Sequence, residues 1–304
     1  VGTSLTEASD PVVRAGAELA RCWNAELHFF HAFSLPVAYF AAPAGVATIP
    51  PNLIDSERQV RRRMLDEQLR RLELDPELPT GVVIEAGAVH RMLLDNAAEL
   101  DADLIVVGAS ETPGRVLRGN TADRVLRQAT CPVWIATGLS ELPPRRTLAP
   151  VDLSPLSESC LRRGLELLDA LPEGEGAAVD ALFVLTDEER QSSTQFSPEQ
   201  IERLAYEELD RFVERLAEAE CHPIRQRRVR IGDIRTEVVR EIEQTPTDLL
   251  LLGTHGRSGF ERLLLGSVAS DLASRAPCDV LIVPPIEALE EALPQAVAAG
   301  GSHG

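Results

Sequence analysis

The chain contains the same sequence pattern twice, and this repeat constrains its fold more than any other feature. The segment at residues 102–108 (ADLIVVG) returns at residues 247–253 (TDLLLLG). The segment at residues 129–135 (ATCPVWI) returns at residues 276–282 (APCDVLI). The two offsets, 145 and 147 residues, are nearly equal, so the segments belong to two copies of one domain.

The length of the chain agrees with two domains. Its 304 residues exceed an ordinary single domain of about 150 residues. We expect one domain over residues 1–140, a second over residues 145–286 and a tail over residues 287–304. Residues 137–146, which include a Pro-Pro pair, are expected to link the domains. The first strand is expected to be truncated, because the chain begins inside a strand-like run.

Each copy alternates segments that are typical of strands and helices. In the second copy, strands are expected at residues 147–152, 179–185, 227–231, 249–253 and 280–283. Amphipathic helices are expected between them, at residues 156–171, 198–219, 233–243 and 267–275. The fourth strand is apolar throughout, as in a parallel sheet that is buried on both faces. We therefore predict an α/β fold with two tandem, doubly wound, five-stranded parallel-sheet domains.

The charges of the chain exclude several classes of function. The formal net charge is −18, which argues against binding to nucleic acid or to an anionic membrane surface. All 30 basic residues are arginine. A Walker A loop, a protein-kinase site and a Schiff-base mechanism each need a lysine, so none of the three is available.

The cysteines and the hydropathy pattern indicate a cytoplasmic protein. The five cysteines are scattered and include no CxxC pair, which is typical of reduced thiols rather than of disulfides or a metal site. No apolar run reaches the roughly 18 residues of a membrane span, and the first residues do not resemble a signal peptide.

A glycine-rich loop follows the apolar strand of the second copy. Its glycines are Gly253, Gly256 and Gly266, and Ser267 stands at the expected start of a helix. Glycine lets backbone N–H groups point into one concavity, and a helix N-terminus adds N–H donors and a positive dipole end. Arg257 would either neutralise phosphate charge or lie in solvent. The pattern predicts a phosphate site, although an ordinary turn with Ser267 as the helix N-cap has the same sequence.

The spacing of this loop, Gly-x2-Gly-x9-Gly-Ser after an apolar strand, resembles the ATP-binding loop of the universal stress protein family. The strand that ends in Pro150-Val151-Asp152 is similar to the first strand of that family. The resemblance covers nearly the whole chain, twice. It implies two flavodoxin-like domains of the nucleotide-binding α-hydrolase type, packed against each other as a pseudo-dimer.

The resemblance also implies a ligand, which is ATP or else ADP or AMP, with or without Mg²⁺. Asp152 would orient the adenosine, Val184 would line the adenine, and the loop would hold the phosphates. The residues expected to bind the nucleotide are Asp152, Val184, Gly253, Gly256, Arg257, Gly266 and Ser267.

The first copy departs from this pattern. Ser4 takes the place of the aspartate, Glu111 that of the second loop glycine, and Asn120 that of the serine. A carboxylate would repel phosphates, so we expect the first nucleotide site to be degenerate and mainly structural. Gly114, Gly119 and Asn120 could still hold a smaller ligand.

Three functions agree with these observations. The leading one is a cytosolic stress-response or regulatory protein that binds one adenine nucleotide in its second domain and hydrolyses it slowly or not at all. The second is a nucleotide hydrolase or adenylyl-transferring enzyme on the same fold, although neither copy carries the first-strand loop of such enzymes. The third is a nucleotide-free interaction module. The sequence identifies no protein partner and leaves a homodimer open.

Each copy ends in an apolar strand, at residues 133–136 and 280–283. A separate domain would expose the backbone of this strand as an open sheet edge. In the family that the chain resembles, this strand pairs across a two-fold axis. The resemblance therefore implies that the two final strands pair with each other, so that one chain covers both edges.

Overall fold

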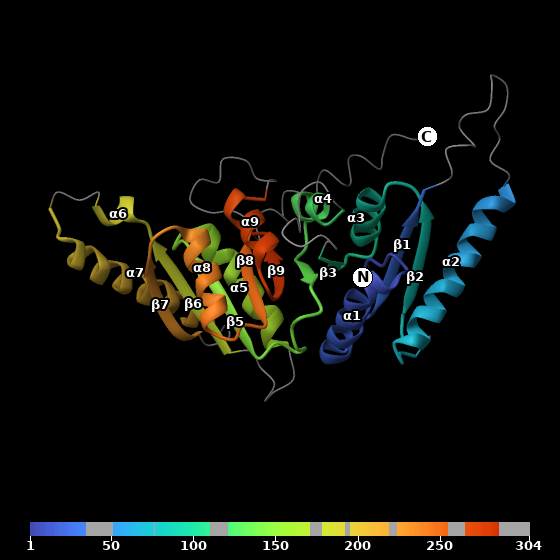
Figure 1. Ribbon diagram of the computed structural model, residues 1–304, viewed down its shortest axis with the longest axis horizontal. Helices are drawn as coiled ribbons and strands as arrows, with labels where there is room; N and C mark the ends of the chain where they lie inside the picture. The colour runs from blue at the N-terminus through green and yellow to red at the C-terminus, as the bar shows by residue number, and fades with distance from the viewer. Residues whose placement is uncertain are drawn as a thin grey trace, which may run out of the picture.

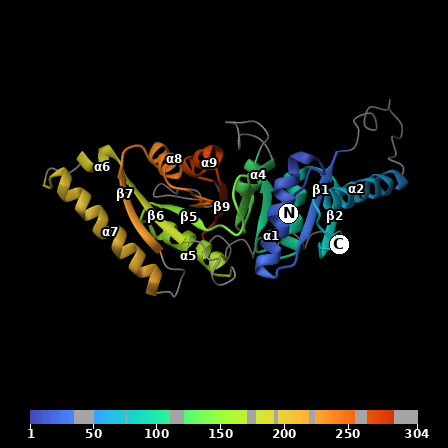
Figure 2. The ribbon, with the colours of Figure 1, turned by 60° about the horizontal axis from the view of Figure 1, so that its bottom comes forward.

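Helices and strands alternate along the chain. The strands lie in a long row, with helices on both of its faces (Figure 1, Figure 2). This computed structural model describes residues 1–34, 51–75, 77–109, 121–170, 178–191, 195–218, 224–254 and 265–285. None of the helices in these ranges has the length and apolar content needed to cross a membrane.

The first half of the chain begins with a strand of minimal length. Gly2 forms a parallel bridge with Phe30, and its N–H donates to the Val106 carbonyl at 2.9 Å. Residues 1–3 thereby join two longer strands, β1 and β3. The elements of this half are η1 (Glu7–Ser9), α1 (Asp10–Trp23), β1 (His28–Phe33), α2 (Pro51–Arg71), β2 (Gly81–Ala86), α3 (Val89–Glu99), β3 (Ile105–Gly108), α4 (Thr121–Gln128) and β4 (Val133–Ala136).

The second half contains every strand and helix expected from the sequence, with ends shifted by a few residues. Ser154 and Asp233 accept the N–H bonds that cap two of its helices, α5 and α8. One short helix, α6, was not expected. The elements are β5 (Arg146–Val151), α5 (Pro155–Asp169), β6 (Ala178–Leu185), α6 (Asp187–Gln191), α7 (Pro198–Glu218), β7 (Ile224–Ile231), α8 (Ile234–Gln244), β8 (Leu249–Gly253), α9 (Ser267–Arg275) and β9 (Asp279–Val283).

The strands of the second half are all parallel and lie in the order β7-β6-β5-β8-β9. Numbered within the half, this order is 3-2-1-4-5, as in the first five strands of the dinucleotide-binding fold. Flavodoxin itself has the order 2-1-3-4-5. The prediction of tandem parallel α/β domains is confirmed, but the expected flavodoxin-like strand order is wrong, because β5 lies between β6 and β8.

The two halves meet through their final strands. β4 pairs with β9 in antiparallel fashion, with Trp134 opposite Leu281, and this pairing continues the sheet from one half into the other. The predicted pairing of the final strands is therefore confirmed. Because the two strands are antiparallel, the carboxyl ends of the parallel strands point in opposite directions in the two halves.

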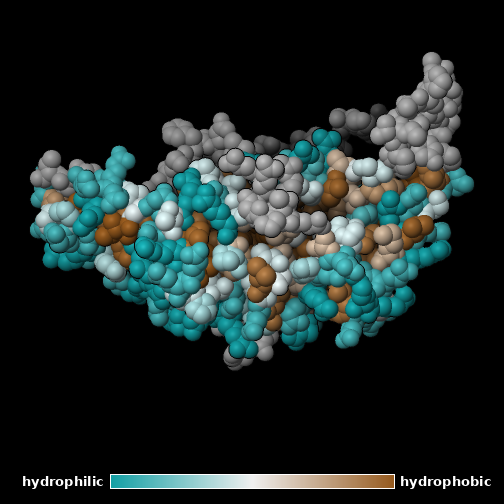
Figure 3. Space-filling model, in the orientation of Figure 1, coloured by the Kyte–Doolittle hydropathy of each residue, from teal (hydrophilic) through white to brown (hydrophobic). Residues whose placement is uncertain are grey.

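The core of the second half consists of two apolar layers, one on each face of the sheet. Along β8, Leu249 and Leu251 face the layer that contains residues of α5 and α7, whereas Leu250 and Leu252 face α8 and α9. Each fully buried leucine contributes about 1.5–3 kcal/mol relative to an exposed one. The face of the molecule drawn in Figure 3 is largely hydrophilic, with scattered hydrophobic residues.

A buried carboxylate fixes the junction between the halves. Asp279 of β9 is 2% exposed. It accepts hydrogen bonds from Trp134 Nε1 at 2.8 Å, from Thr137 N at 2.8 Å and from Thr137 Oγ1 at 2.7 Å. The Ser140 hydroxyl accepts a hydrogen bond from the Asp279 N–H at 2.9 Å. One residue of the second half therefore holds β4 and the linker that follows it.

Candidate functional site

The expected nucleotide-binding residues lie at the carboxyl edge of the second half, where β5, β6 and β8 end. Asp152 directly follows β5. Its Oδ1 accepts a hydrogen bond from Ser154 N at 3.0 Å, and its own N–H donates to Ser157 Oγ at 3.4 Å. The carboxylate is therefore held by a backbone N–H, and the backbone of Asp152 by a hydroxyl, both at the start of α5.

Val184 lies near the end of the neighbouring strand β6, and its side chain is buried. It belongs to the apolar layer beneath α8, together with Val238 and Ile242. Leu185, rather than Val184, is the last residue of β6. Contact between Val184 and an adenine would therefore come from the strand backbone or from the margin of this layer.

The two ends of the glycine loop lie against each other. Thr254 follows β8, and its N–H donates to the Val283 carbonyl at 3.1 Å. The Thr254 carbonyl accepts the Gly266 N–H at 2.8 Å, and a Cβ on Gly266 would lie only 3.2 Å from that carbonyl oxygen. The close approach explains why glycine is needed there. Gly256 and Arg257 lie outside the described residues.

The helix after the loop begins at Ser267, with Gly266 as its N-cap. The interpretation of Ser267 as an ordinary N-cap is therefore wrong, because the helix starts at Ser267 itself, one residue earlier than that interpretation requires. The Ser267 hydroxyl instead accepts a hydrogen bond from Arg235 Nη2 at 3.3 Å. No motif in the sequence pointed to Arg235, which lies on α8 and is 32 residues from Ser267.

A buried thiol shows that Asp152 and the end of β8 share one environment. Burial raises the pKa of the Cys160 thiol to about 12, the backbone of Thr254 opposes this shift through a hydrogen bond, and the Asp152 carboxylate adds to it. The thiol of α5 thus interacts with residues after both β5 and β8. β5 and β8 are also neighbouring parallel strands, so their carboxyl ends lie side by side.

The corresponding edge of the first half has a different composition. Gln68 of α2 is 2% exposed. Its Nε2 donates to the Thr6 carbonyl at 3.0 Å and to Ser9 Oγ at 3.1 Å, and its Oε1 accepts from Thr3 Oγ1 at 3.0 Å. The Ser4 hydroxyl, at the position of Asp152, lies 2.7 Å from Thr6 Oγ1. Gln68 Nε2 also donates to Asp10 Oδ1 at 2.8 Å, so a carboxylate of α1 takes part in this network, while a hydroxyl stands at the position of Asp152. The first-copy loop residues Glu111, Gly114, Gly119 and Asn120 lie outside the described residues.

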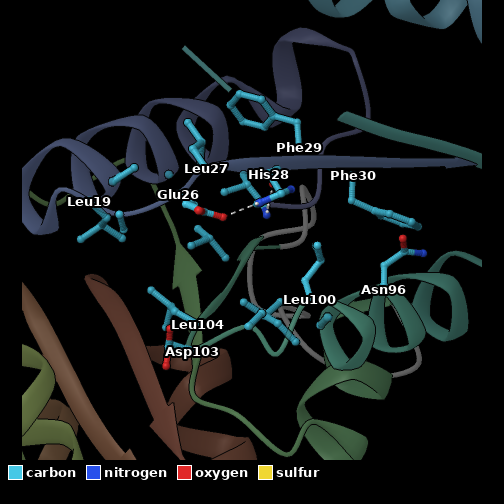
Figure 4. A pocket seen from close by; sticks show the side chains of 18 of the residues that line it. Leu19, Glu26, Leu27, His28, Phe29, Phe30, Asn96, Leu100, Asp103 and Leu104 are labelled. Carbon is cyan, nitrogen blue, oxygen red and sulfur yellow. Dashed lines mark hydrogen bonds and ion pairs between the residues drawn. The ribbon is translucent and has the colours of Figure 1, made fainter. Parts of the chain in front are cut away.

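A cavity of about 500 Å³ lies elsewhere, at the amino ends of β1 and β3 (Figure 4). Apolar side chains such as Leu19, Phe30 and Leu104 line it, together with the carboxylates of Glu26 and Asp103. Glu26 forms an ion pair with His28 at 3.5 Å if the imidazole is protonated. Acidic groups in an apolar lining do not suit a polyphosphate, so this cavity and the expected nucleotide site are different places.

Comparisons with known proteins agree with the repeat. The model of the Universal stress protein family matches residues 1–137 and 144–284. A universal stress protein of Mycolicibacterium smegmatis is 28% identical over 306 residues, which cover 94% of this chain and 96% of that protein.

Solved structures show the same relationship. A universal stress protein from Archaeoglobus fulgidus has a TM-score of 0.59 at 15% identity, over 93% of this chain and 94% of that one. A universal stress protein solved in complex with cAMP is 23% identical, with a TM-score of 0.34, over 46% of this chain and 96% of its own.

Proposed function

Because the chain belongs to the universal stress protein family, we propose that its second half binds ATP or a related adenine nucleotide. The observation that carries this proposal is the position of Asp152 beside the end of β8, where Gly266 and Ser267 begin α9. The proposed binding residues are Asp152, Val184, Gly253, Gly256, Arg257, Gly266 and Ser267.

The spacing of the strands suits an extended nucleotide. β5 lies between β6 and β8, and adjacent strands are about 4.8 Å apart, so the ends of β6 and β8 are separated by about 10 Å. A nucleotide that crosses the end of β5 would place its adenine near Val184 and its ribose near Asp152. Its phosphates would then lie at the end of β8.

The start of α9 offers the groups that phosphates need. The first N–H groups of a helix have no partner within the helix, and the helix dipole places partial positive charge there. Gly266 adds a backbone that a ligand can approach closely. These local groups can hold an anion in a chain of net charge −18, because salt screens distant charges beyond about 8 Å.

We further propose that the protein acts in the cytoplasm as a stress-response or regulatory protein, with slow hydrolysis or none. The chain has no lysine to stabilise a transferring phosphoryl group. Efficient hydrolysis would also need a positioned base with a second group to orient it. In this proposal, nucleotide binding changes the affinity of the protein for a partner rather than supplying the energy of a reaction.

Calorimetric titration with ATP, ADP, AMP and cAMP, each with and without Mg²⁺, tests the proposal. We expect one site per chain. The variant Asp152→Ala is expected to lose at least tenfold in affinity, since one charged hydrogen bond contributes about 1.5–3 kcal/mol. Ser4→Ala changes the matching position of the first half and is expected to leave the affinity unchanged.

Two equivalent sites per chain would contradict the assignment to the second half. No binding by protein that has been shown to be free of nucleotide would contradict nucleotide binding altogether. Rapid and saturable phosphate release that Asp152→Ala abolishes would instead indicate a hydrolase. Circular dichroism of both variants shows whether the fold is retained.

A further inference from the structure

The side chain of Arg235 reaches from α8 to the start of α9. We propose that Arg235 binds the terminal phosphates of the nucleotide and makes the site prefer di- and triphosphates to monophosphates. This inference rests on the proposed nucleotide site and adds to it a residue that the glycine-loop motif does not contain.

The position of Arg235 follows from the packing of two helices. α8 and α9 lie side by side on one face of the sheet (Figure 1, Figure 2). Arg235 is the second residue of α8, and its Nη2 donates to Ser267 Oγ at 3.3 Å. Its Nε lies 3.6 Å from Asp271 Oδ2, and the side chain is 34% exposed. A guanidinium therefore lies directly beside the proposed phosphate-binding end of α9.

The contacts of Arg235 are weaker than those of nearby arginines. Arg230 donates to Glu241 Oε2 from both Nε, at 2.9 Å, and Nη2, at 2.6 Å, and that carboxylate is 1% exposed. Arg235, in contrast, has a long hydroxyl contact and a carboxylate at 3.6 Å in the part of the chain that the structure describes. Because a guanidinium has five N–H donors, Arg235 keeps donors for an anion at the mouth of the site.

The composition of the chain explains why an arginine would be needed near the phosphates. A polyphosphate brings several negative charges, and lysine, which neutralises them in many nucleotide sites, is absent. A guanidinium can hold two phosphate oxygens at once, through parallel N–H bonds. In the first half, where the glycine at the start of the matching helix is Gly87, the position of Arg235 is taken by His90. The cation thus belongs to the half with the complete glycine motif.

The distance from the adenine explains the expected selectivity. Ser267 follows the loop from β8, which is two strands away from the strand of Val184. The single phosphate of a monophosphate stays next to the ribose. The second and third phosphates extend toward α9, where Arg235 and Ser267 meet.

The test compares Arg235→Gln with Arg275→Gln in the full-length protein. Both substitutions remove one positive charge, and both arginines contact Asp271 Oδ2. Arg275 lies eight residues after Ser267, about 12 Å further along α9. Titration with ATP and AMP at constant ionic strength therefore separates a direct contact from a general effect of charge.

We expect Arg235→Gln to weaken ATP binding by tenfold or more, which corresponds to about 1.4 kcal/mol, and to change AMP binding by less than about twofold. Arg275→Gln is expected to leave ATP binding within about threefold of the wild type. Arg235→Lys keeps the charge but not the paired donors, so it should recover part of the loss. Circular dichroism and a thermal melt confirm that each variant is folded.

Two results would overturn the inference and leave nucleotide binding in place. One is an equal effect of Arg235→Gln and Arg275→Gln on ATP affinity. The other is an equal loss of ATP and AMP affinity in Arg235→Gln. If the wild-type protein binds neither nucleotide, the proposed function fails, and this inference fails with it.

Discussion

Replacing Asp279 by alanine is expected to lower the free energy of unfolding by about 2–4 kcal/mol. The substitution leaves the indole N–H of Trp134 and the backbone N–H of Thr137 without their acceptor. Each buried donor that loses its partner costs about 1–3 kcal/mol. Burial raises the pKa of Asp279 because the charged carboxylate is costly to bury. Removing the carboxylate therefore offsets part of the free energy lost with its hydrogen bonds.

A double-mutant cycle distinguishes this mechanism from a simple loss of packing. Trp134→Phe removes one donor and leaves the two Thr137 groups bonded to Asp279, so it should cost about 1–2 kcal/mol beyond the change in packing. In the double variant no indole N–H is left to satisfy. The combined loss should therefore be smaller than the sum of the single losses by at least about 1 kcal/mol.

Urea unfolding measures these free energies. The chain has two tryptophans, Trp23 and Trp134, whose rings lie 6.5 Å apart at the junction, so fluorescence reports directly on this region. Far-UV circular dichroism must give the same midpoint for the comparison to hold. Additive losses, within about 0.5 kcal/mol, would refute the claim that Asp279 acts through the Trp134 indole.

Three further predictions concern the pH dependence, the junction and the buried thiols. Because burial raises the pKa of Asp279 above 3.8, the folded state binds this proton more tightly than the unfolded chain. The contribution of Asp279 to stability is thus greatest at low pH and falls as the pH rises from 3.8 through the folded pKa. Asp279→Asn should remove this dependence of the urea midpoint on pH when midpoints are measured across this range. A chain cut to residues 145–286 leaves β9 without β4 and should self-associate, which light scattering can measure. A stable monomer that still binds ATP would show that the second half does not need a strand paired with β9. The thiols of Cys160 and Cys278 have pKa values raised to about 12 by burial. They should therefore react with a thiol reagent in urea but very slowly in the native protein. Rapid labelling of the native protein would show that the structure around these thiols opens easily.

The repeat and its periodicity were sufficient to predict the fold class and every element of the second half except α6. These signals are local, and they do not contain the order of strands in a sheet. The order 3-2-1-4-5 depends on where each crossover returns, which is decided by packing of the whole domain. The expected elements are therefore present, but their arrangement had to come from the structure.

One missed element had a signal in the sequence. The segment of α6 (DEERQ) has no apolar periodicity, so it did not suggest a helix. Thr186, however, directly precedes this segment and stands three residues before Glu189, which is the pattern of a capping box. The structure contains both bonds of that box, from Thr186 N to Glu189 Oε2 at 2.9 Å and from Glu189 N to Thr186 Oγ1 at 3.2 Å.

The candidate site was predictable where it follows one continuous motif and not where distant segments meet. Gly253, Gly266 and Ser267 belong to one stretch of sequence, so their spacing could be interpreted directly. Arg235 belongs to another helix, and only the packing of α8 against α9 brings it to Ser267. The sequence also could not show that the side chain of Val184 faces the apolar layer, because both faces of a buried parallel strand are apolar.

The hydrogen bonds of Asp279 distinguish the contact between the two different halves from a contact between two identical halves. By the repeat, the counterpart of Asp279 is Pro132 and the counterpart of Trp134 is Leu281. In an isologous dimer of two second halves with the same register, Leu281 would stand where Trp134 stands, so the Asp279 carboxylate would be buried without its indole donor. The contact of a second half with another second half is thus disfavoured relative to the contact within the chain. The linker keeps the halves together, and Asp279 makes the second half select the first half over another copy of itself.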